Sequence, residues 1–402
     1  MKRRTSAVFA VFGLIGVTAA VVVSFALLAP PSTALVNYPP AWAPQDAGTT
    51  EALWDVEFTD ELSGWVVGEG GAALATTDGG ATWRPLPVGS GLDLFGVEFV
   101  DSATGWVVGS HGAILATTDG GRTWDQQHTG DELLAAVDFA DGDHGWAVGA
   151  AGRILATTDG GLTWRRQSPP AGASGDLVDV AFADARTGWA VGATADAGGP
   201  AGVVLATTDG GATWERSLTT PDQTLTRLFA AGPANAWAVG DDGAAAEWKG
   251  EKWSTRDVAS GEDLRGVAFP AGGSGWVVGS PASGLGGGVI LRSDDAGTSW
   301  SPESRWEAAL HDVCFPSPTV GWAVGEDGTI LRYGYPGVSP SVSPSPTFSA
   351  SLLVSPTSNP TPSPPGDADE KGTSGWALVA GIAAVIALAV TVVALTVTRK
   401  RG

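Results

Sequence analysis

The sequence predicts an all-β protein: a seven-bladed β-propeller of four-stranded blades, followed by a disordered stalk and a C-terminal transmembrane helix. Three observations lead to the propeller. A tryptophan motif recurs seven times, a second tryptophan motif follows six of these copies, and the missing copy of the second motif lies at the other end of the domain. A repeat of about 40–45 residues with four strands is typical of propeller blades.

The leading motif reads Trp-Val/Ala-Val-Gly and predicts the second strand of each blade. Successive leading tryptophans stand 39 to 48 residues apart. They are Trp65, Trp106, Trp146, Trp189, Trp237, Trp276 and Trp322.

The closing motif ends in a tryptophan that stands 22 to 25 residues before the next leading tryptophan. Trp42 stands 23 residues before Trp65, so we expect it to supply the seventh closing strand. The last blade would then be split between the two ends of residues 37–335. A split blade joins the first and last units of a closed ring, whereas an open solenoid keeps its ends apart.

Each unit is predicted to begin with a strand that carries Leu, then Val or Leu three residues later, and in six units Phe two residues further on. The last two positions have a period of two, so they share one strand face. Leu53, Val56 and Phe58 are the first set, and the fifth unit has Ala230 in place of Phe. A single blade is too small to hold a core, so stacked blades must bury both faces, with the repeat tryptophans in the core.

The turn between the third and fourth strands reads Thr/Ser-x-Asp-x-Gly-x-Thr/Ser-Trp in five units, an Asp box. The Gly permits positive φ, and the Asp carboxylate is expected to accept turn N–H groups. We predict a structural role for these aspartates and tryptophans. They are Asp78, Asp119, Asp159, Asp209 and Asp295, with Trp83, Trp124, Trp164, Trp214 and Trp300.

These Asp boxes and the Trp-x-Val-Gly strands resemble the propellers of the photosystem II assembly/stability factor family, a group within the BNR-like repeats that also include sialidases. The resemblance covers about residues 41–333. It implies an exported seven-bladed ring that assists membrane-protein assembly without catalysis. The family meets its partner with basic residues of the ring, whereas this ring is acidic.

The two ends of the chain predict export and anchoring. Residues 1–34 are a signal peptide or a signal anchor, because three basic residues precede an apolar run, and both fates stay open. Residues 336–373 are a Pro/Ser/Thr-rich stalk. Residues 374–398 are a transmembrane helix, with the apolar run Gly375–Val397, and 399–402 are a basic tail. The positive-inside rule places the tail in the cytoplasm and the ring outside the cell membrane.

The composition limits the classes of partner and ligand that we expect the protein to bind. The formal net charge is −21, so the phosphates of nucleic acid would be repelled. Cys314 is the sole cysteine, and the four histidines have no ligand spacing, so we expect no metal and no cofactor. We expect a monomeric ring whose partner is a protein or a cell-envelope glycan.

The candidate binding residues lie at one end of the leading strands and in two long loops. Asp55, Asp179 and Asp312 share a position, Glu57, Glu98 and Asp138 stand two residues further on, and Arg227 lies in the fifth leading strand. Solvated channel residues are the competing interpretation. Asp196 and Leu285 lie in the long connections of units four and six, which are either flexible insertions or binding loops.

We therefore predict a membrane-anchored extracytoplasmic propeller that acts as a protein-binding or assembly/stability factor-like module, with no catalytic residues. The alternative is a cell-surface glycoside hydrolase, sialidase-like in its propeller, that uses channel carboxylates. The three tyrosines of the chain disfavour a true sialidase, because none starts a leading strand.

Overall fold

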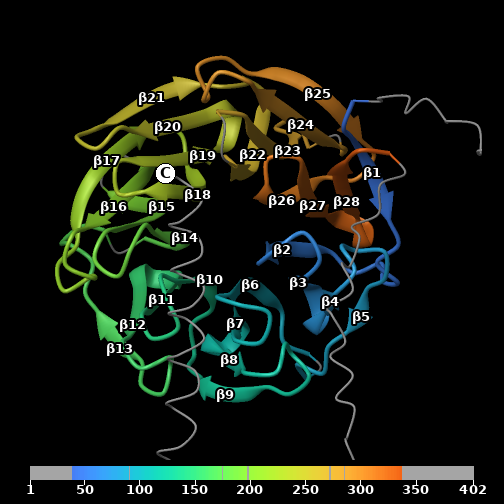
Figure 1. Ribbon diagram of the computed structural model, residues 1–402. Helices are drawn as coiled ribbons and strands as arrows, with labels where there is room; N and C mark the ends of the chain where they lie inside the picture. Colours follow the sequence, from blue (N-terminus) through green and yellow to red (C-terminus); the bar gives the residue numbers. More distant parts are fainter. Residues whose placement is uncertain are drawn as a thin grey trace, which may run out of the picture. The chain divides into compact units, whose positions relative to one another are not determined.

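The computed structural model describes residues 39–336, apart from 90, 174, 197–198, 271–272 and 285. In this part of the chain seven four-stranded antiparallel sheets surround a central channel (Figure 1). The seven-bladed propeller predicted from the repeats is therefore confirmed.

The innermost strands contact one another around the ring. They are β2 (Leu53–Phe58), β6 (Leu94–Phe99), β10 (Leu134–Phe139), β14 (Leu177–Phe182), β18 (Leu225–Gly232), β22 (Glu262–Ala268) and β26 (Leu310–Ser317). The second strands carry the leading tryptophans: β3 (Gly64–Gly68), β7 (Gly105–Gly109), β11 (Gly145–Gly149), β15 (Gly188–Asp196), β19 (Asn235–Gly240), β23 (Gly275–Pro281) and β27 (Val320–Gly325).

The third strands are β4 (Ala73–Thr76), β8 (Ile114–Thr117), β12 (Arg153–Thr157), β16 (Gly199–Thr207), β20 (Ala244–Trp248), β24 (Gly288–Ser293) and β28 (Ile330–Gly334). The outer strands are β5 (Arg84–Pro85), β9 (Asp125–His128), β13 (Arg165–Gln167), β17 (Glu215–Pro221), β21 (Trp253–Asp257), β25 (Ser301–Trp306) and β1 (Ala41–Gln45). Short 3₁₀ helices join second to third strands in five blades: η1 (Glu69–Gly71), η2 (Ser110–Gly112), η3 (Ala150–Gly152), η4 (Asp241–Gly243) and η5 (Glu326–Gly328).

The ring closes through a split blade, as the position of Trp42 predicts. Strand β1 pairs antiparallel with β28, with Trp42 opposite Tyr333, in a sheet of order β1-β28-β27-β26. Gln45 at the end of β1 then ties this blade to the next. Its side chain donates to the Gly79 carbonyl at 3.1 Å and accepts the indole N–H of Trp83 at 3.4 Å. The N-terminal strand thus holds the last and first blades together.

The core lies between blades and is built from aromatic stacks. Trp106 stacks on Phe139 of the next blade with centroids 3.5 Å apart, and Trp164 meets the same Phe edge-on at 5.9 Å. The leading tryptophans are at most 3 % exposed, whereas several closing tryptophans are only half-buried. The leading set therefore supplies more of the core than the closing set.

The fifth blade shows how the pattern tolerates a missing Phe. Ala230 stands at the Phe position, and Trp189 packs instead against Trp248 and Trp253, with centroids 6.0 and 6.2 Å away. Trp248 occupies the position of the Asp-box aspartate. The loss of that box therefore accompanies a compensating aromatic side chain.

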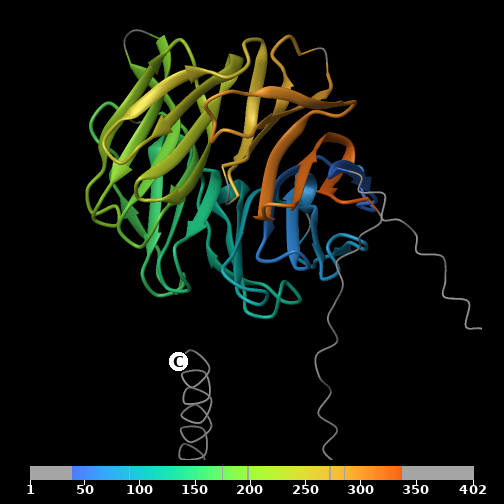
Figure 2. The ribbon, with the colours of Figure 1, turned by 45° about the horizontal axis from the view of Figure 1, so that its top comes forward.

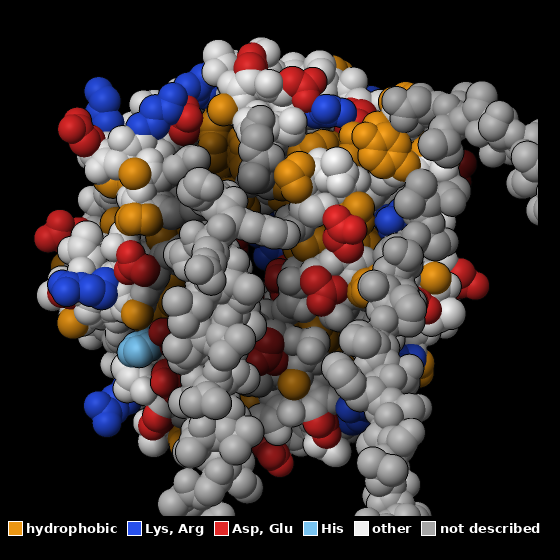
Figure 3. Space-filling view, viewed as in Figure 1, with side chains coloured by type: hydrophobic (Ala, Val, Ile, Leu, Met, Phe, Trp, Pro, Cys, Tyr) orange, Lys and Arg blue, Asp and Glu red, His pale blue; other side chains and the backbone are white. Residues whose placement is uncertain are grey.

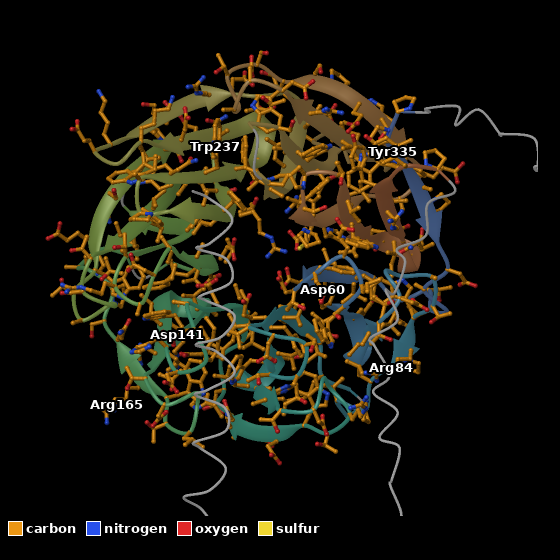
Figure 4. All side chains as sticks on the ribbon, viewed as in Figure 1. Asp60, Arg84, Asp141, Arg165, Trp237 and Tyr335 are labelled. Atoms are coloured by element: carbon orange, nitrogen blue, oxygen red, sulfur yellow. The ribbon has the colours of Figure 1, made fainter. Side chains whose placement is uncertain are left out.

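The two faces of the ring carry different turns. On one, which we call the 3₁₀ face, the Glu69 N–H donates to the Ala52 carbonyl, which precedes an innermost strand. On the other, the Asp-box face, the Gly79 N–H donates to the Leu62 carbonyl in a turn between first and second strands. Figure 4 labels Asp60 and Asp141, which lie in two of these first-to-second-strand turns around the channel.

The two long connections behave differently from short 3₁₀ turns. Strands β15 and β16 remain paired up to Asp196 and Gly199, so the fourth blade carries an extended hairpin. Figure 2 shows this green hairpin projecting beyond the neighbouring blades. The insertion thus continues the sheet of the fourth blade, and its role as a binding loop stays a prediction.

The predicted signal segment, most of the stalk and the transmembrane helix lie outside the described residues. Within the residues that the structure does describe, no helix is long and apolar enough to cross a membrane. The predicted anchoring thus stays a prediction.

Candidate functional site

The channel is lined by successive positions of the innermost strands. The upper layer, nearest the 3₁₀ face, consists of the residue two positions after the first Leu of each innermost-strand pattern. Small residues in this layer follow from close strand approach, because a Cβ on Gly266 would lie 2.9 Å from the Asp312 Cα. The seven residues are Asp55, Gly96, Ala136, Asp179, Arg227, Gly266 and Asp312.

Arg227 reaches across the channel and binds three aspartates from three other blades. Its Nη2 lies 2.7 Å from Asp55 Oδ1 and its Nε lies 3.2 Å from Asp312 Oδ1. Its Nη1 lies 3.9 Å from Asp179 Oδ1. The structure therefore brings together four of the residues predicted as a binding set, and we call this cluster the plug.

The aspartates of the plug also accept hydrogen bonds from neighbouring blades. The Val97 N–H donates to Asp55 Oδ2 at 2.7 Å, and the Val56 N–H donates to Asp312 Oδ2 at 3.2 Å. The Leu228 N–H donates to Asp179 Oδ2 at 2.6 Å. Backbone donors facing the channel would otherwise lack partners, so these carboxylates join adjacent blades. Solvated channel residues, the competing interpretation, do not fit this geometry.

The lower layer, toward the Asp-box face, holds three more carboxyl groups. Glu57, Glu98 and Asp138 lie two residues further along β2, β6 and β10. Burial, with the charges of Asp55 and Asp138, raises the pKa of Glu57 to about 8. Burial raises the pKa of Asp138 to about 7 and that of Glu98 well above its usual value. At neutral pH the pKa of about 8 favours the protonated form of Glu57.

A recess of about 350 Å³ lies over the lower layer. Phe58, Phe182 and Phe315 line it beside the carboxyl groups, so it extends toward the Asp-box face. Figure 3 shows the ring hollowed at its centre, with acidic side chains around the hollow. Sequence spacing located the lower carboxyl groups, and Phe229 and Cys314 stand at the equivalent positions of β18 and β26 and also line the recess.

We expect the ring to be more stable at pH 5.5 than at pH 9. The pKa of Glu57 rises from 4.5 to about 8 in the folded ring. A raised carboxyl pKa adds stability that is complete below the unfolded pKa and is lost as pH rises through the folded pKa. The melting temperature should therefore fall between pH 5.5 and 9, and less steeply for Glu57→Gln. A melting temperature that rises over this interval contradicts the assignment.

The Asp-box residues form self-contained turns, as Asp119 illustrates. Its Oδ1 accepts the Thr123 N–H at 2.9 Å and its Oδ2 accepts the Thr123 hydroxyl at 2.7 Å. The buried Thr117 hydroxyl donates to Asp119 and accepts the Gly121 N–H at 2.9 Å. Hydrogen bonds from Thr123 lower the pKa of Asp119 to about 2. Equivalent bonds occur at Asp78, Asp159, Asp209 and Asp295.

The remaining predicted residues do not join the plug. The backbone of Asp196 ends β15, on a hairpin of the fourth blade. Leu285 lies outside the described residues. In the part of the chain that the structure describes, no group of three His, Cys, Asp or Glu side chains is arranged to hold a metal ion.

The family model described as photosynthesis system II assembly factor YCF48 matches three overlapping segments, residues 36–94, 85–168 and 128–216. These segments span the first three blades and most of the fourth, with the box turns of Asp78, Asp119, Asp159 and Asp209. Over these residues the ring is similar to the YCF48 family. The resemblance predicted from the Asp boxes is therefore confirmed.

Solved structures share the propeller fold of this chain. "YCF48 bound to D1 peptide" is 24% identical with a TM-score of 0.59, and the match covers 74% of this chain and 98% of that one. YCF48 from Cyanidioschyzon merolae is 23% identical with a TM-score of 0.59, over 73% and 98% of the two chains. The GH74 enzyme of Niastella koreensis is 14% identical with a TM-score of 0.56, over 72% and 53%. No curated protein sequence matches this chain significantly.

Proposed function

We propose that this chain is a membrane-anchored extracytoplasmic propeller that binds a protein partner and assists its assembly or stability without catalysis. The observation that carries the proposal is the plug. The spacing marks Asp55, Asp179 and Asp312 as candidate acids. Their carboxylates are already bound by Arg227 and by backbone N–H groups. A binding module needs such a rigid ring, whereas an acid–base pair needs carboxyl groups free to face a substrate.

The family supports a protein as the partner. A propeller of the same fold, YCF48, has been solved bound to D1 peptide. A ring of stacked blades presents broad, rigid faces, which suit recognition of another protein. The identity of that protein is not part of the proposal.

The glycoside hydrolase alternative has less support. Such enzymes hold two carboxyl groups about 5–9.5 Å apart on either side of the scissile bond. The plug aspartates are bound to Arg227 instead, and the likeness to the GH74 enzyme, at 14% identity, concerns the fold alone. Glu57, Glu98 and Asp138 are the carboxyl groups left for this alternative, and variants of Glu57 and Glu98 are used for its test below.

The proposed topology rests on the sequence of the two ends. Basic residues flank the predicted cytoplasmic side of both apolar runs, and the run Gly375–Val397 contains no charge. Protease added outside intact cells should cut within 339–365 and release the ring, while a tag after Gly402 stays protected. Digestion of that tag from outside, with the membrane intact, contradicts the orientation.

Crosslinking in intact host cells tests the function. A photoreactive residue is placed at Glu69 on the 3₁₀ face or at Leu162 on the Asp-box face, which is 83% exposed. We expect a discrete adduct with one envelope or membrane protein from one of the two positions. Adducts with polysaccharide alone, or no discrete protein adduct from either position, contradict a protein-binding role.

A further inference from the structure

A partly exposed aromatic pair lies beside the channel on the 3₁₀ face. Trp54 of β2 stacks on Phe95 of β6 with ring centroids 4.8 Å apart and planes 12° from parallel. Both side chains remain partly exposed, and Leu133, just before β10, is 40% exposed. We call Trp54, Phe95 and Leu133 the aromatic patch. An apolar surface of this kind on a soluble ring marks a place for contact.

The equivalent side chains of later blades have partners within the ring, and Val178 of the fourth blade packs against the core cluster that contains Trp189. Thr226 donates its hydroxyl hydrogen to the Leu264 carbonyl at 2.7 Å. Arg265 lies 3.4 Å from Asp263, and His311 lies 2.9 Å from Glu326. Trp54 and Phe95, by contrast, stack on each other and leave apolar area facing solvent. The patch is therefore confined to blades one to three.

Exposed acidic residues flank the aromatic patch along the chain. Glu51 stands three residues before Trp54, and the Glu69 N–H binds the Ala52 carbonyl beside it. Asp131 precedes Leu133 by two residues and is exposed, as are Glu51 and Glu69. Within the described residues these three carboxylates form no ion pair, and the nearby Arg153 is already paired with Glu132. The local charge is thus negative and uncompensated.

We propose that the aromatic patch docks a basic segment of the protein partner, in which an aromatic or large apolar side chain is flanked by Lys or Arg. This inference rests on the proposed protein-binding function and adds the chemistry of the partner. The central side chain packs on Trp54 and Phe95, as anchors do at the centre of interfaces. A flanking cation lies over the indole face or beside Glu69, and the acidic rim speeds association.

Synthetic peptides test the chemistry directly with the full-length chain in zwitterionic nanodiscs. The probe is a fluorescent Lys-rich peptide with a central Trp, and its matched forms carry central Ala, or Glu in place of Lys. Anisotropy should show binding of the probe, at least about tenfold weaker binding of the Ala form, and no binding of the Glu form. Affinity should fall with added salt.

Matched variants locate the site. Trp54→Ala and Phe95→Ala should each weaken probe binding about tenfold or more, and Glu69→Lys should weaken it and flatten the salt dependence. Leu162→Ala and Glu251→Lys, on exposed positions of the Asp-box face, should leave it unchanged. Circular dichroism and melting confirm that each ring is folded, and Glu69→Lys keeps the test valid should an aromatic variant unfold.

Three results overturn the inference: no binding of the probe, equal binding of the Glu form, or wild-type affinity in folded Trp54→Ala and Glu69→Lys rings. A protein adduct in the crosslinking experiment combined with any of these results means that the ring binds a protein elsewhere. In that case the docking chemistry fails while the proposed function stands. If the crosslinking experiment gives no protein adduct and the probe peptide does not bind, the docking chemistry and the proposed function both fail.

Discussion

Replacing Arg227 by Met should lower the free energy of unfolding of the ring by about 3–5 kcal/mol, because removing one partner of a buried ion pair leaves uncompensated charge. Asp55, Asp179 and Asp312 would then face one another across the channel without a cation. Protonation can relieve this repulsion, so the loss should be larger at pH 8 than at pH 5. Chemical denaturation at both pH values measures it.

Arg265→Met is the matched control for this prediction. Arg265 also lies in an innermost strand, but its side chain is 38% exposed and pairs with Asp263 near the surface. An exposed pair contributes about 0–1 kcal/mol, so this variant should remain close to wild type. If Arg227→Met loses no more stability than Arg265→Met, the plug does not hold the blades together.

Loss of the N-terminal closing strand should have the second large effect. Trp42→Ala alone should cost about 3 kcal/mol, the lower end for a core Trp because this side chain is half-buried. The indole packs on Tyr333 at 5.3 Å and edge-on against Phe315 at 5.8 Å. Deleting residues 39–48 should cost more, because it also removes Gln45 and exposes the β28 edge.

Leu162→Ala is the control for the closing strand, since a side chain that is 83% exposed should change stability by less than about 0.5 kcal/mol. Thermal melts followed by tryptophan fluorescence measure both variants. A ring without residues 39–48 that melts at the wild-type temperature would show that β1 does not close the ring.

Repeat spacing predicted the blades and their closure, since each strand leaves a local pattern. Trp42 was assigned to the last blade from a 23-residue offset, and the pairing of Trp42 with Tyr333 confirms it. The plug left no such local pattern. Spacing aligned Asp55, Asp179 and Asp312, but whether they line a wet channel or bind Arg227 depends on distances across the ring, which no single blade encodes.

Two other features could not be predicted from the sequence, for physical reasons. Trp248 stands at the position of an Asp-box aspartate, and it packs against Trp189 where Ala230 leaves space. The stack of Trp54 on Phe95 joins two residues 41 positions apart at a register shift of the innermost strand. The residues at the second position of the innermost strands follow no hydrophobic pattern, so the exposure of Trp54 and Phe95 is seen only in the folded ring.

We propose that the ring acts by binding a protein and not through chemistry of its channel carboxyl groups. The direct test is the yield of the photocrosslinked partner adduct in host cells that express only a Glu57→Gln/Glu98→Gln chain. These substitutions mimic the protonated groups that burial favours, so the ring should stay folded. We predict that these cells give the same adduct yield as cells with the wild-type chain. We also predict that they show the same phenotype as wild type when both are compared with cells that lack the chain. Loss of the phenotype with a folded ring and an undiminished adduct would contradict the account and favour a catalytic channel.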